Sequence, residues 1–548
     1  MKHIFRLLVS LFFPLIVGAQ QIDIKYLPVQ DGGRVKPYGI FAEEMLEIVY
    51  GKSKFEGREA YEIILTWMLS PSSWSGKAIF EVRNHELLDN LKLDKSRRHF
   101  TGEEVFGNER FTMLRQELQA KRESKEKLNP YFQALQRLEN QFIVFREIAE
   151  GRMLRVAPPT EGDSWIGVAD LQGPEQEAFL NLTKAFVTYI GAVAEGKSKD
   201  ELSQLVGEFN ASVLKFKEIA QAKNPSLYPS DFKIATEVHY SHFHPFRWAY
   251  ILYLVAAILL LLVWALDKQG LMKWGWVFIG LGFIVHTYGF GLRVYLMERA
   301  PVTNMYETVV WVSWGVVLFA AILEWIYKFR FVLLAGSLVG LFSLIVADMA
   351  PAVLDPTLQP LEPVLRSNYW LVIHVMTITI SYAAFFLAFG LGDMGLVYYL
   401  RGEEKHKEKI KAIATAIYRC TQIGIVFLAP GIILGGIWAD YSWGRFWGWD
   451  PKETWALIAL LGYLAVLHAR IAGMLKDFGM VVTSILTFSL VIMAWYGVNF
   501  VLGAGLHSYG FGAGGIEYVS AFVIGHFLFC AYVGYVRHQR LKNVGVAK

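Results

Sequence analysis

The stretch Tyr441-Ser-Trp-Gly-Arg-Phe-Trp-Gly-Trp-Asp-Pro-Lys-Glu-Thr-Trp455 lies between two apolar runs that are long enough to be membrane helices. It contains four tryptophans, at positions 443, 447, 449 and 455. Indole rings are flat, rigid and apolar, each has one N–H group that needs a partner, and they favour the boundary between membrane and water. The stretch therefore predicts a broad aromatic shelf at a membrane surface.

The second half of this stretch has the pattern of a helix start. Asp450 can be the N-cap, Pro451 the first helical residue, and Glu453 completes a capping box. We therefore expect the two carboxylates to set the geometry of the backbone rather than to transfer protons.

The composition around the stretch is that of a membrane protein. Of 548 residues, 54% are hydrophobic, 15% are aromatic and only 19% are charged, which excludes a soluble domain and a disordered chain. The net charge of +4 gives no reason to expect nucleic acid as a partner. The chain has two cysteines, Cys420 and Cys530, and no Cys-x-x-Cys pair, so it cannot perform dithiol redox chemistry by itself.

The first 245 residues are predicted to precede the membrane part. Residues 1–20 combine a basic start, a short apolar core and the small-residue site Val17-Gly-Ala19, which favours a signal peptide over an anchor helix. Residues 21–245 are polar and charged with mostly helical periodicity, above all over 102–150 and 173–222. They predict a mainly helical extracytoplasmic domain, whose charge runs are interpreted as solvated helix faces.

Residues 246–548 contain nine apolar runs of about twenty residues, each long enough to cross a membrane. The runs are 248–266, 273–291, 305–327, 331–350, 369–392, 415–437, 454–472, 479–500 and 517–536. With the N-terminal domain outside, the cytoplasmic loops hold about fifteen Lys and Arg residues and the outer loops about five, as the positive-inside rule requires. The sequence predicts an all-α polytopic membrane protein with the tryptophan stretch on its outer face.

Two histidines belong to the same outer face as the tryptophans. His374 lies near the outer end of the fifth run, and His507 lies in the outer loop after the eighth run. Two neutral imidazoles beside an aromatic shelf are what a six-coordinate haem iron requires. The alternative is two unrelated interfacial histidines, but their shared face favours a haem site.

Other histidines are weaker candidates. His468 falls in the inner half of the seventh run, where an ionisable group marks a functional site by default, although an interhelical hydrogen bond explains it equally well. His286 lies toward the outer end of its run, so a partner ligand from another chain is expected for His468. His239, His242 and His244 crowd together before the first run, yet a metal site there is the less favoured interpretation.

Several motifs resemble one known family. Residues 443–455 resemble the tryptophan-rich WWD motif of haem-handling proteins, and most closely that of the CcsA-type cytochrome c biogenesis proteins of system II, also found in fused CcsBA (ResBC) synthetases. Supporting matches are Pro301-Val-Thr-Asn-Met-Tyr-Glu-Thr308, Asn368-Tyr-Trp-Leu-Val-Ile-His374 and Gly505-Leu-His-Ser508. The resemblance spans roughly residues 272–536, and 21–245 only loosely resembles extracytoplasmic regions of such systems.

The resemblance implies a multi-pass protein of the inner (cytoplasmic) membrane, with its N-terminal domain on the periplasmic side. His374 and His507 match the external haem ligands of the family and His468 matches a transmembrane ligand. The WWD segment 441–455 is implied to contact the haem b substrate through Trp443, Trp447, Trp449, Asp450 and Trp455. Implied partners are a CcsB/ResB-like membrane protein that supplies a further histidine, apocytochrome c, thiol-reducing proteins and membrane lipid.

Three functions remain open on the sequence alone. A subunit of a cytochrome c synthase would attach haem covalently to a Cys-x-x-Cys-His segment. A haem exporter or chaperone of CcmC type would only hand haem on, but such chains are short, so residues 21–245 favour the first reading. A membrane scaffold without haem would use its tryptophans only as an interfacial belt.

Overall fold

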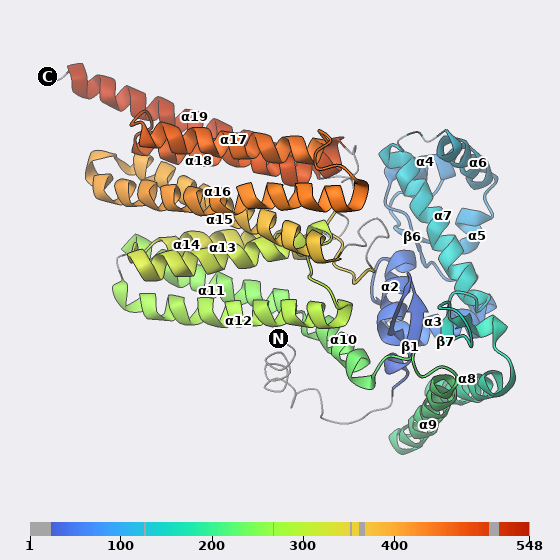
Figure 1. The fold of residues 1–548 in the computed structure, drawn as a ribbon. Helices are drawn as coiled ribbons and strands as arrows, with labels where there is room; N and C mark the ends of the chain where they lie inside the picture. Colours follow the sequence, from blue (N-terminus) through green and yellow to red (C-terminus); the bar gives the residue numbers. More distant parts are fainter. Residues whose placement is uncertain are drawn as a thin grey trace. The chain divides into compact units, whose positions relative to one another are not determined.

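The computed structural model describes residues 23–546 apart from 125, 127, 267, 351–352, 361–367 and 503–514. The chain divides into two compact units, Met1–Phe243 and His244–Lys548. The segment predicted as a signal peptide or anchor, 1–20, lies outside the described residues. The predicted fold class is confirmed, because both units are built mainly of helices (Figure 1).

The first unit combines helices with three small antiparallel sheets. The largest sheet has the strand order β2-β1-β7-β8, and Val29 of β1 pairs with Lys36 of β2. The strands are β1 (Pro28–Asp31), β2 (Arg34–Pro37), β3 (Lys54–Phe55), β4 (Arg58–Glu59), β5 (Phe80–Glu81), β6 (His99–Phe100), β7 (Arg155–Ala157) and β8 (Ile166–Gly167). Each of these strands has only two to four residues, too few to give a clear alternating pattern in the sequence.

The helices of the first unit include the two long segments that the periodicity predicts. They are α2 (Tyr38–Tyr50), α3 (Ala60–Leu69), α4 (His85–Leu91), α5 (Gly102–Phe106), α6 (Glu109–Glu123), α7 (Pro130–Ala149), α8 (Gly173–Ala194), α9 (Lys199–Lys223) and α10 (Asp231–Phe243). The break between α8 and α9 has a physical cause. Gly196 adopts a left-handed φ of 70°, and Ser198 caps α9 in a capping box with Glu201.

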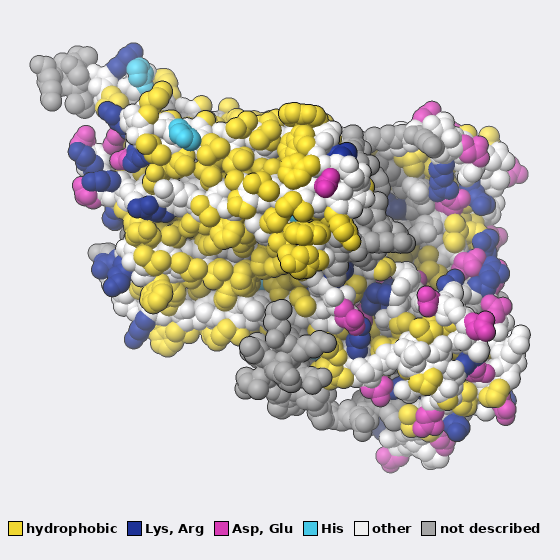
Figure 2. Space-filling view, viewed as in Figure 1, with side chains coloured by type: hydrophobic (Ala, Val, Ile, Leu, Met, Phe, Trp, Pro, Cys, Tyr) yellow, Lys and Arg dark blue, Asp and Glu magenta, His cyan; other side chains and the backbone are white. Residues whose placement is uncertain are grey.

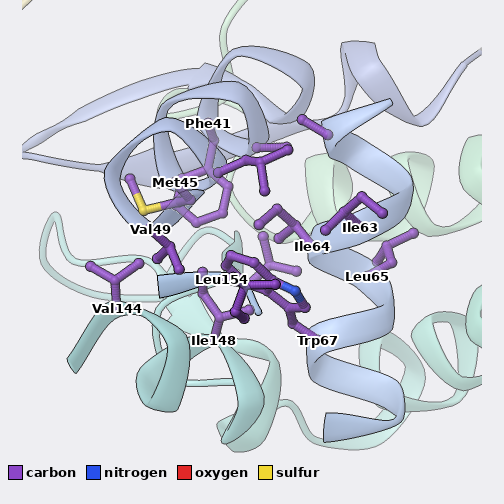
Figure 3. Close-up of a cluster of buried hydrophobic side chains, with 14 of the residues drawn as sticks. Phe41, Met45, Val49, Ile63, Ile64, Leu65, Trp67, Val144, Ile148 and Leu154 are labelled. Atoms are coloured by element: carbon purple, nitrogen blue, oxygen red, sulfur yellow. The ribbon is translucent and has the colours of Figure 1, made fainter. Parts of the chain in front are cut away.

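A continuous apolar core holds this first unit together. Figure 3 shows side chains of α2, α3 and α7 pointing toward one another around Trp67, which is fully buried. Phe41, Met45 and Val49 follow one another at a spacing of four residues, so they form a stripe along one face of α2. The core therefore follows from ordinary helical amphipathicity.

The second unit contains eight helices that are long and apolar enough to cross a membrane, counted among the described residues. A ninth such helix, Asp231–Leu266, comprises α10 of the first unit and α11 of the second unit. Its helices are α11 (Pro245–Leu266), α12 (Met272–Met297), α13 (Met305–Tyr327), α14 (Val332–Met349), α15 (Asn368–Arg401), α16 (Lys407–Trp443), α17 (Pro451–Ile471), α18 (Asp477–Ile492), the π-helix η8 (Met493–Leu502) and α19 (Ile516–Val546). Hydrophobic side chains cover their outer surface in a broad band (Figure 2). The nine predicted runs are thus confirmed as helices.

Successive helices of this bundle run in opposite directions, so its connections fall at two ends. Among the described residues, one end holds the segments 298–304, 353–360 and 444–450, and we call it the tryptophan end. The other end holds 267–271, 328–331, 402–406 and 472–476, and we call it the basic end. Lys and Arg side chains gather at the basic end, where α19 leaves the bundle (Figure 2).

Candidate functional site

The predicted helix start at the tryptophan stretch is present in the structure. Asp450 Oδ1 accepts a hydrogen bond from the backbone N–H of Lys452 at 2.9 Å. In return, Glu453 Oε2 accepts from the backbone N–H of Asp450 at 3.1 Å, which completes the capping box of α17. The expectation that these two carboxylates shape the backbone is therefore borne out by their contacts.

Glu453 also holds the loop that carries the tryptophans. Its carboxylate accepts from the backbone N–H of Gly448 at 2.8 Å and forms an ion pair with Arg445 at 3.2 Å. The Arg445 guanidinium in turn lies 5.6 Å from the centre of the Trp443 ring, within cation–π range. One carboxylate thus fixes both the start of α17 and the irregular segment between α16 and α17.

The four tryptophans of the stretch have different surroundings. Trp443 packs edge-on against Trp438, with ring centres 4.7 Å apart, and Trp438 is almost fully buried. Trp447 and Trp449 also meet edge to face at 5.8 Å, and Trp449 remains 69% exposed. Trp455 is half-buried in α17. Trp438 was not singled out from the sequence, although its place five residues before Trp443 could have indicated it.

A cavity of about 160 Å³ lies at the tryptophan end. Of the four predicted tryptophans, Trp447 is the one that lines it among the described residues. The wall comes from the start of α13, from α15, α16 and α17, and from η8: Val302, Thr303, Asn304, Met305, Thr308, His374, Val375, Ile378, Thr379, Tyr382, Ile432, Gly435, Gly436, Trp438, Trp447, Lys452, Glu453, Ala456, Ala494, Trp495 and Asn499. Segments more than a hundred residues apart therefore share one site.

His374 occupies the wall of this cavity in a fixed orientation. Its Nδ1 lies 2.8 Å from the carbonyl oxygen of Gly431, and since a carbonyl can only accept, Nδ1 must carry the proton. In the neutral ring the lone pair is then on Nε2, the usual arrangement of a metal-ligating histidine. The ring stacks on Trp438 at an interplanar angle of 8°, and a Cβ added to Gly435 would lie 2.6 Å from His374 Cε1.

The other predicted histidines do not join His374 in the described part of the site. His507 lies outside the described residues, so its pairing with His374 stays a prediction. His468 is exposed on α17, where its Nδ1 bonds to the carbonyl of Leu464 at 2.7 Å. It is not part of the cavity lining, which is consistent with a separate role.

Two further histidine expectations can be compared with the structure. His286 is fully buried, and its two ring nitrogens lie 3.2 Å from the Tyr253 hydroxyl and the Val310 carbonyl, so it is a structural side chain. Near His239, His242 and His244, the described residues contain no group of three His, Cys, Asp or Glu side chains able to hold a metal ion. The less favoured metal site therefore gains no support.

The sequence did not reveal a buried charge cluster around Glu307, which contacts Thr303 of the cavity wall. Glu307 is paired with Arg293 at 2.8 Å and with Arg299 at 3.1 Å, and all three side chains are buried. Glu307 also accepts from the backbone N–H of Thr303 at 2.9 Å, while Arg293 donates to the carbonyl of Pro356 at 2.9 Å. The cluster fixes the 298–304 connection, whose last residues line the cavity.

The eighth apolar run ends in a π-helix at the cavity. Within η8, Trp495 donates its indole N–H to the Thr308 hydroxyl at 3.0 Å, which joins this segment to α13. Asn499 lies one turn later and also lines the cavity. A π-helix is rare and is found mostly at functional positions, so this run differs from an ordinary membrane helix where it meets the site.

Comparison with known proteins matches this chain to one family model and to several relatives. The family of the cytochrome C assembly protein matches residues 302–507. Protein NrfI of Wolinella succinogenes is 27% identical over 508 residues, which are 87% of this chain and 53% of NrfI, so this chain spans about half of that relative.

Two shorter relatives are matched over most of their length. The cytochrome c biogenesis protein CcsA of Parasynechococcus marenigrum is 31% identical over 290 residues, 48% of this chain and 94% of the relative. CcsA of Guillardia theta is 34% identical over 235 residues, 38% of this chain and 76% of the relative. The family match over residues 302–507 covers the residues that line the cavity, the WWD segment and Glu307. The chain belongs to the cytochrome c assembly family, among relatives named CcsA.

Proposed function

We propose that this protein carries haem to the tryptophan end and presents it there for covalent attachment to apocytochrome c. The observation that carries the proposal is the orientation of His374, whose Nδ1–H donates to the Gly431 carbonyl. With its proton on Nδ1, the imidazole is in the tautomer that binds a metal through Nε2, and we assign it as one ligand of haem iron, with His507 as the expected second ligand. Trp447 supplies an aromatic wall of the same cavity.

The chemistry of attachment limits what the protein has to do. Two reduced thiols of a Cys-x-x-Cys-His segment add across the two vinyl groups of haem b, and two thioether bonds form. The reactive carbons belong to haem, so the protein contributes orientation and shielding of the iron. Cys420 and Cys530 are both buried, so we assign the reduction of the cytochrome thiols to separate thiol-reducing proteins.

His468 is the residue that we assign to holding haem on its way across the membrane. An exposed imidazole on a membrane helix is costly unless another group meets it, and a CcsB/ResB-like partner with a histidine of its own would do so. Haem held between these two histidines would then pass to the His374 site. The excess of Lys and Arg at the basic end supports an inner-membrane orientation with that end in the cytoplasm and the N-terminal unit outside.

The central test removes the proposed iron ligand. The protein is co-expressed with a CcsB/ResB-like partner and an apocytochrome that has one Cys-x-x-Cys-His segment, and covalent haem is measured by haem staining of the denatured reporter. His374→Ala should reduce staining to background because iron loses an axial ligand, whereas His538→Ala, at an exposed position of α19, should not. Imidazole added to the growth medium should partly restore His374→Ala.

Each other outcome has a defined meaning. Normal maturation by His374→Ala contradicts the proposal. If the purified wild-type protein binds haem but the reporter never receives it covalently, the protein is an exporter or chaperone of CcmC type. A wild-type protein that is colourless after purification with its partner points to a scaffold without haem.

A second prediction addresses the route. His468→Ala should lower the amount of haem that copurifies with the protein, because the inner binding position loses a ligand. The absorption spectrum of the purified complex measures this amount. A His468→Ala complex that contains as much haem as the wild type rejects transfer through His468.

A further inference from the structure

A second cavity lies between helices of the membrane-spanning bundle, and several of its lining side chains, such as Leu338 and Phe342, are exposed on the outer surface of the bundle. It has a volume of about 370 Å³, is bordered by α11, α14, α15 and α19, and shares no lining residue with the His374 cavity. Its wall is apolar and rich in aromatic rings: Trp264, Phe342, Phe386, Phe389, Phe522 and Phe529. Two ionisable side chains interrupt this wall, Asp393 of α15 and His526 of α19.

The two ionisable side chains share a proton. His526 Nδ1 lies 2.7 Å from the carbonyl oxygen of Phe522, and since that oxygen can only accept, Nδ1 carries a hydrogen. His526 Nε2 lies 3.4 Å from Asp393 Oδ2. A lone pair on Nε2 facing a carboxylate would be repulsive, so one proton must sit between them, as imidazolium with carboxylate or as imidazole with carboxylic acid.

This pair leaves hydrogen-bonding capacity unused. Asp393 Oδ1 is buried and has no hydrogen-bond partner among the described residues. The side chains of Asp393 and His526 are 32% and 24% exposed, so the pair is not sealed inside the protein. Because exposing an ionisable group to lipid tails is costly, a ligand that brings a hydroxyl donor would be favoured here. Rotation of the carboxylate about Cβ–Cγ lets one oxygen face His526 and the other face such a donor.

The surrounding rings indicate the shape of that ligand. The Phe389 ring lies 4.8 Å and the Phe522 ring 4.3 Å from the His526 ring, and Phe389 and Phe522 lie 5.5 Å apart. Flat rings that cluster around one polar pair fit a flat aromatic headgroup better than a flexible acyl chain. We propose that this cavity binds the ring of a lipid-soluble quinol, with a ring hydroxyl donating to Asp393 beside His526.

A purely structural role of the pair is the competing explanation. Asp393 and His526 join α15 to α19. The most apolar stretch of α19 is only 11% buried inside the protein, so few other contacts hold this helix to the bundle. A tether of this kind predicts that removing the pair loosens α19 without any effect on a ligand. The test must therefore measure binding and helix attachment separately.

The experiment uses the full chain in lipid nanodiscs under argon. Binding of duroquinol, a tetramethylhydroquinone without a lipid tail, is measured by calorimetry and compared with durene, the same ring without hydroxyls. The variants are Asp393→Leu and His526→Phe, which replace the pair by apolar groups of similar shape, and Val397→Phe, which fills the cavity. His538→Phe, on an exposed part of α19, is the matched control.

The expected result distinguishes ligand recognition from tethering. Duroquinol should bind the wild type and His538→Phe at one saturable site, and Asp393→Leu and His526→Phe should each weaken it by about tenfold or more. Durene should bind more weakly and respond only to Val397→Phe. Thermal unfolding in the same nanodiscs reports whether α19 is loosened.

Three outcomes overturn the proposal. The first is the absence of saturable duroquinol binding to the wild type, and the second is equal affinity for duroquinol and durene. The third is unchanged duroquinol affinity in Asp393→Leu and His526→Phe, with a lower unfolding temperature that assigns the pair to tethering. Even if a variant fails to fold, the affinities of duroquinol and durene for the wild-type protein show whether the cavity recognises the hydroxyl groups.

Discussion

At the scale of single residues, His374 is defined by three neighbours on α16. The Gly431 carbonyl fixes its tautomer, Trp438 fixes the plane of its ring, and the missing side chain of Gly435 lets the ring approach the helix. Each of these neighbours affects His374 only by setting where its imidazole ring lies and how the ring is oriented. Substitutions on α16 should therefore affect the site without changing the histidine itself.

Gly435→Ala tests this positioning. The added Cβ would lie 2.6 Å from His374 Cε1, so the imidazole has to move, at a cost of about 1–3 kcal/mol for overpacking. We expect less covalent haem on the reporter cytochrome and an altered haem spectrum of the purified protein. Gly525→Ala is the control, because its Cβ meets nothing within 4 Å. Equal maturation by Gly435→Ala and Gly525→Ala would mean that Gly435 does not position His374.

At the scale of elements, the corner between α16 and α17 decides where the tryptophans lie. Gly444 ends α16 with a left-handed φ of 68°, which glycine adopts without strain. Asp450 and Glu453 then start α17, and Glu453 reaches back to Gly448 and Arg445. The corner is therefore built from the C-terminal cap of α16 and the N-terminal capping box of α17. The carboxylates of Asp450 and Glu453 serve there as hydrogen-bond acceptors.

Asp450→Asn separates a capping role from a proton-transfer role. Asparagine caps helices about as well as aspartate, so this variant should mature the reporter cytochrome normally. Asp450→Ala removes the cap and should lower stability by about 1 kcal/mol. Haem staining and thermal unfolding of the purified variants measure the two effects. Loss of maturation in Asp450→Asn without loss of stability would show that the charge itself is needed.

At the scale of the whole molecule, alternation of the helices places the described residues of the His374 cavity at one end of the bundle. Lys and Arg side chains gather at the opposite end. In the orientation that we propose from the positive-inside rule, the basic end is in the cytoplasm and the N-terminal unit is outside. This orientation is required if an extracytoplasmic apocytochrome is to reach the tryptophan end.

Cysteine labelling tests the orientation in intact cells. Cys420 and Cys530 are buried, so they should react little with a membrane-impermeant maleimide. Ser203→Cys, exposed on α9, should be labelled from outside once the outer barrier of the cell is opened, whereas Lys405→Cys at the basic end should be labelled only after the membrane is permeabilised. The reverse pattern would invert the proposed topology.

The sequence was most informative where one local rule controls the structure. Hydropathy predicted the membrane helices, because crossing a bilayer requires about twenty apolar residues in every case. The capping box at Asp450 was predicted because its hydrogen bonds join residues three positions apart or fewer. The short strands of the first unit were missed, since two or three residues give no readable periodicity.

The features of the candidate site likewise divide into those that the sequence predicted and those that it did not. From the residues alone, His374 could be placed near a helix end and the tryptophan segment at the start of a helix. The cavity that Trp438 and Trp447 share with His374, and the pairing of Glu307 with Arg293 and Arg299, became visible only in the folded chain. Packing between helices selects these partners, even where they are only 8 or 14 residues apart, and such packing leaves no periodic signal in any one segment.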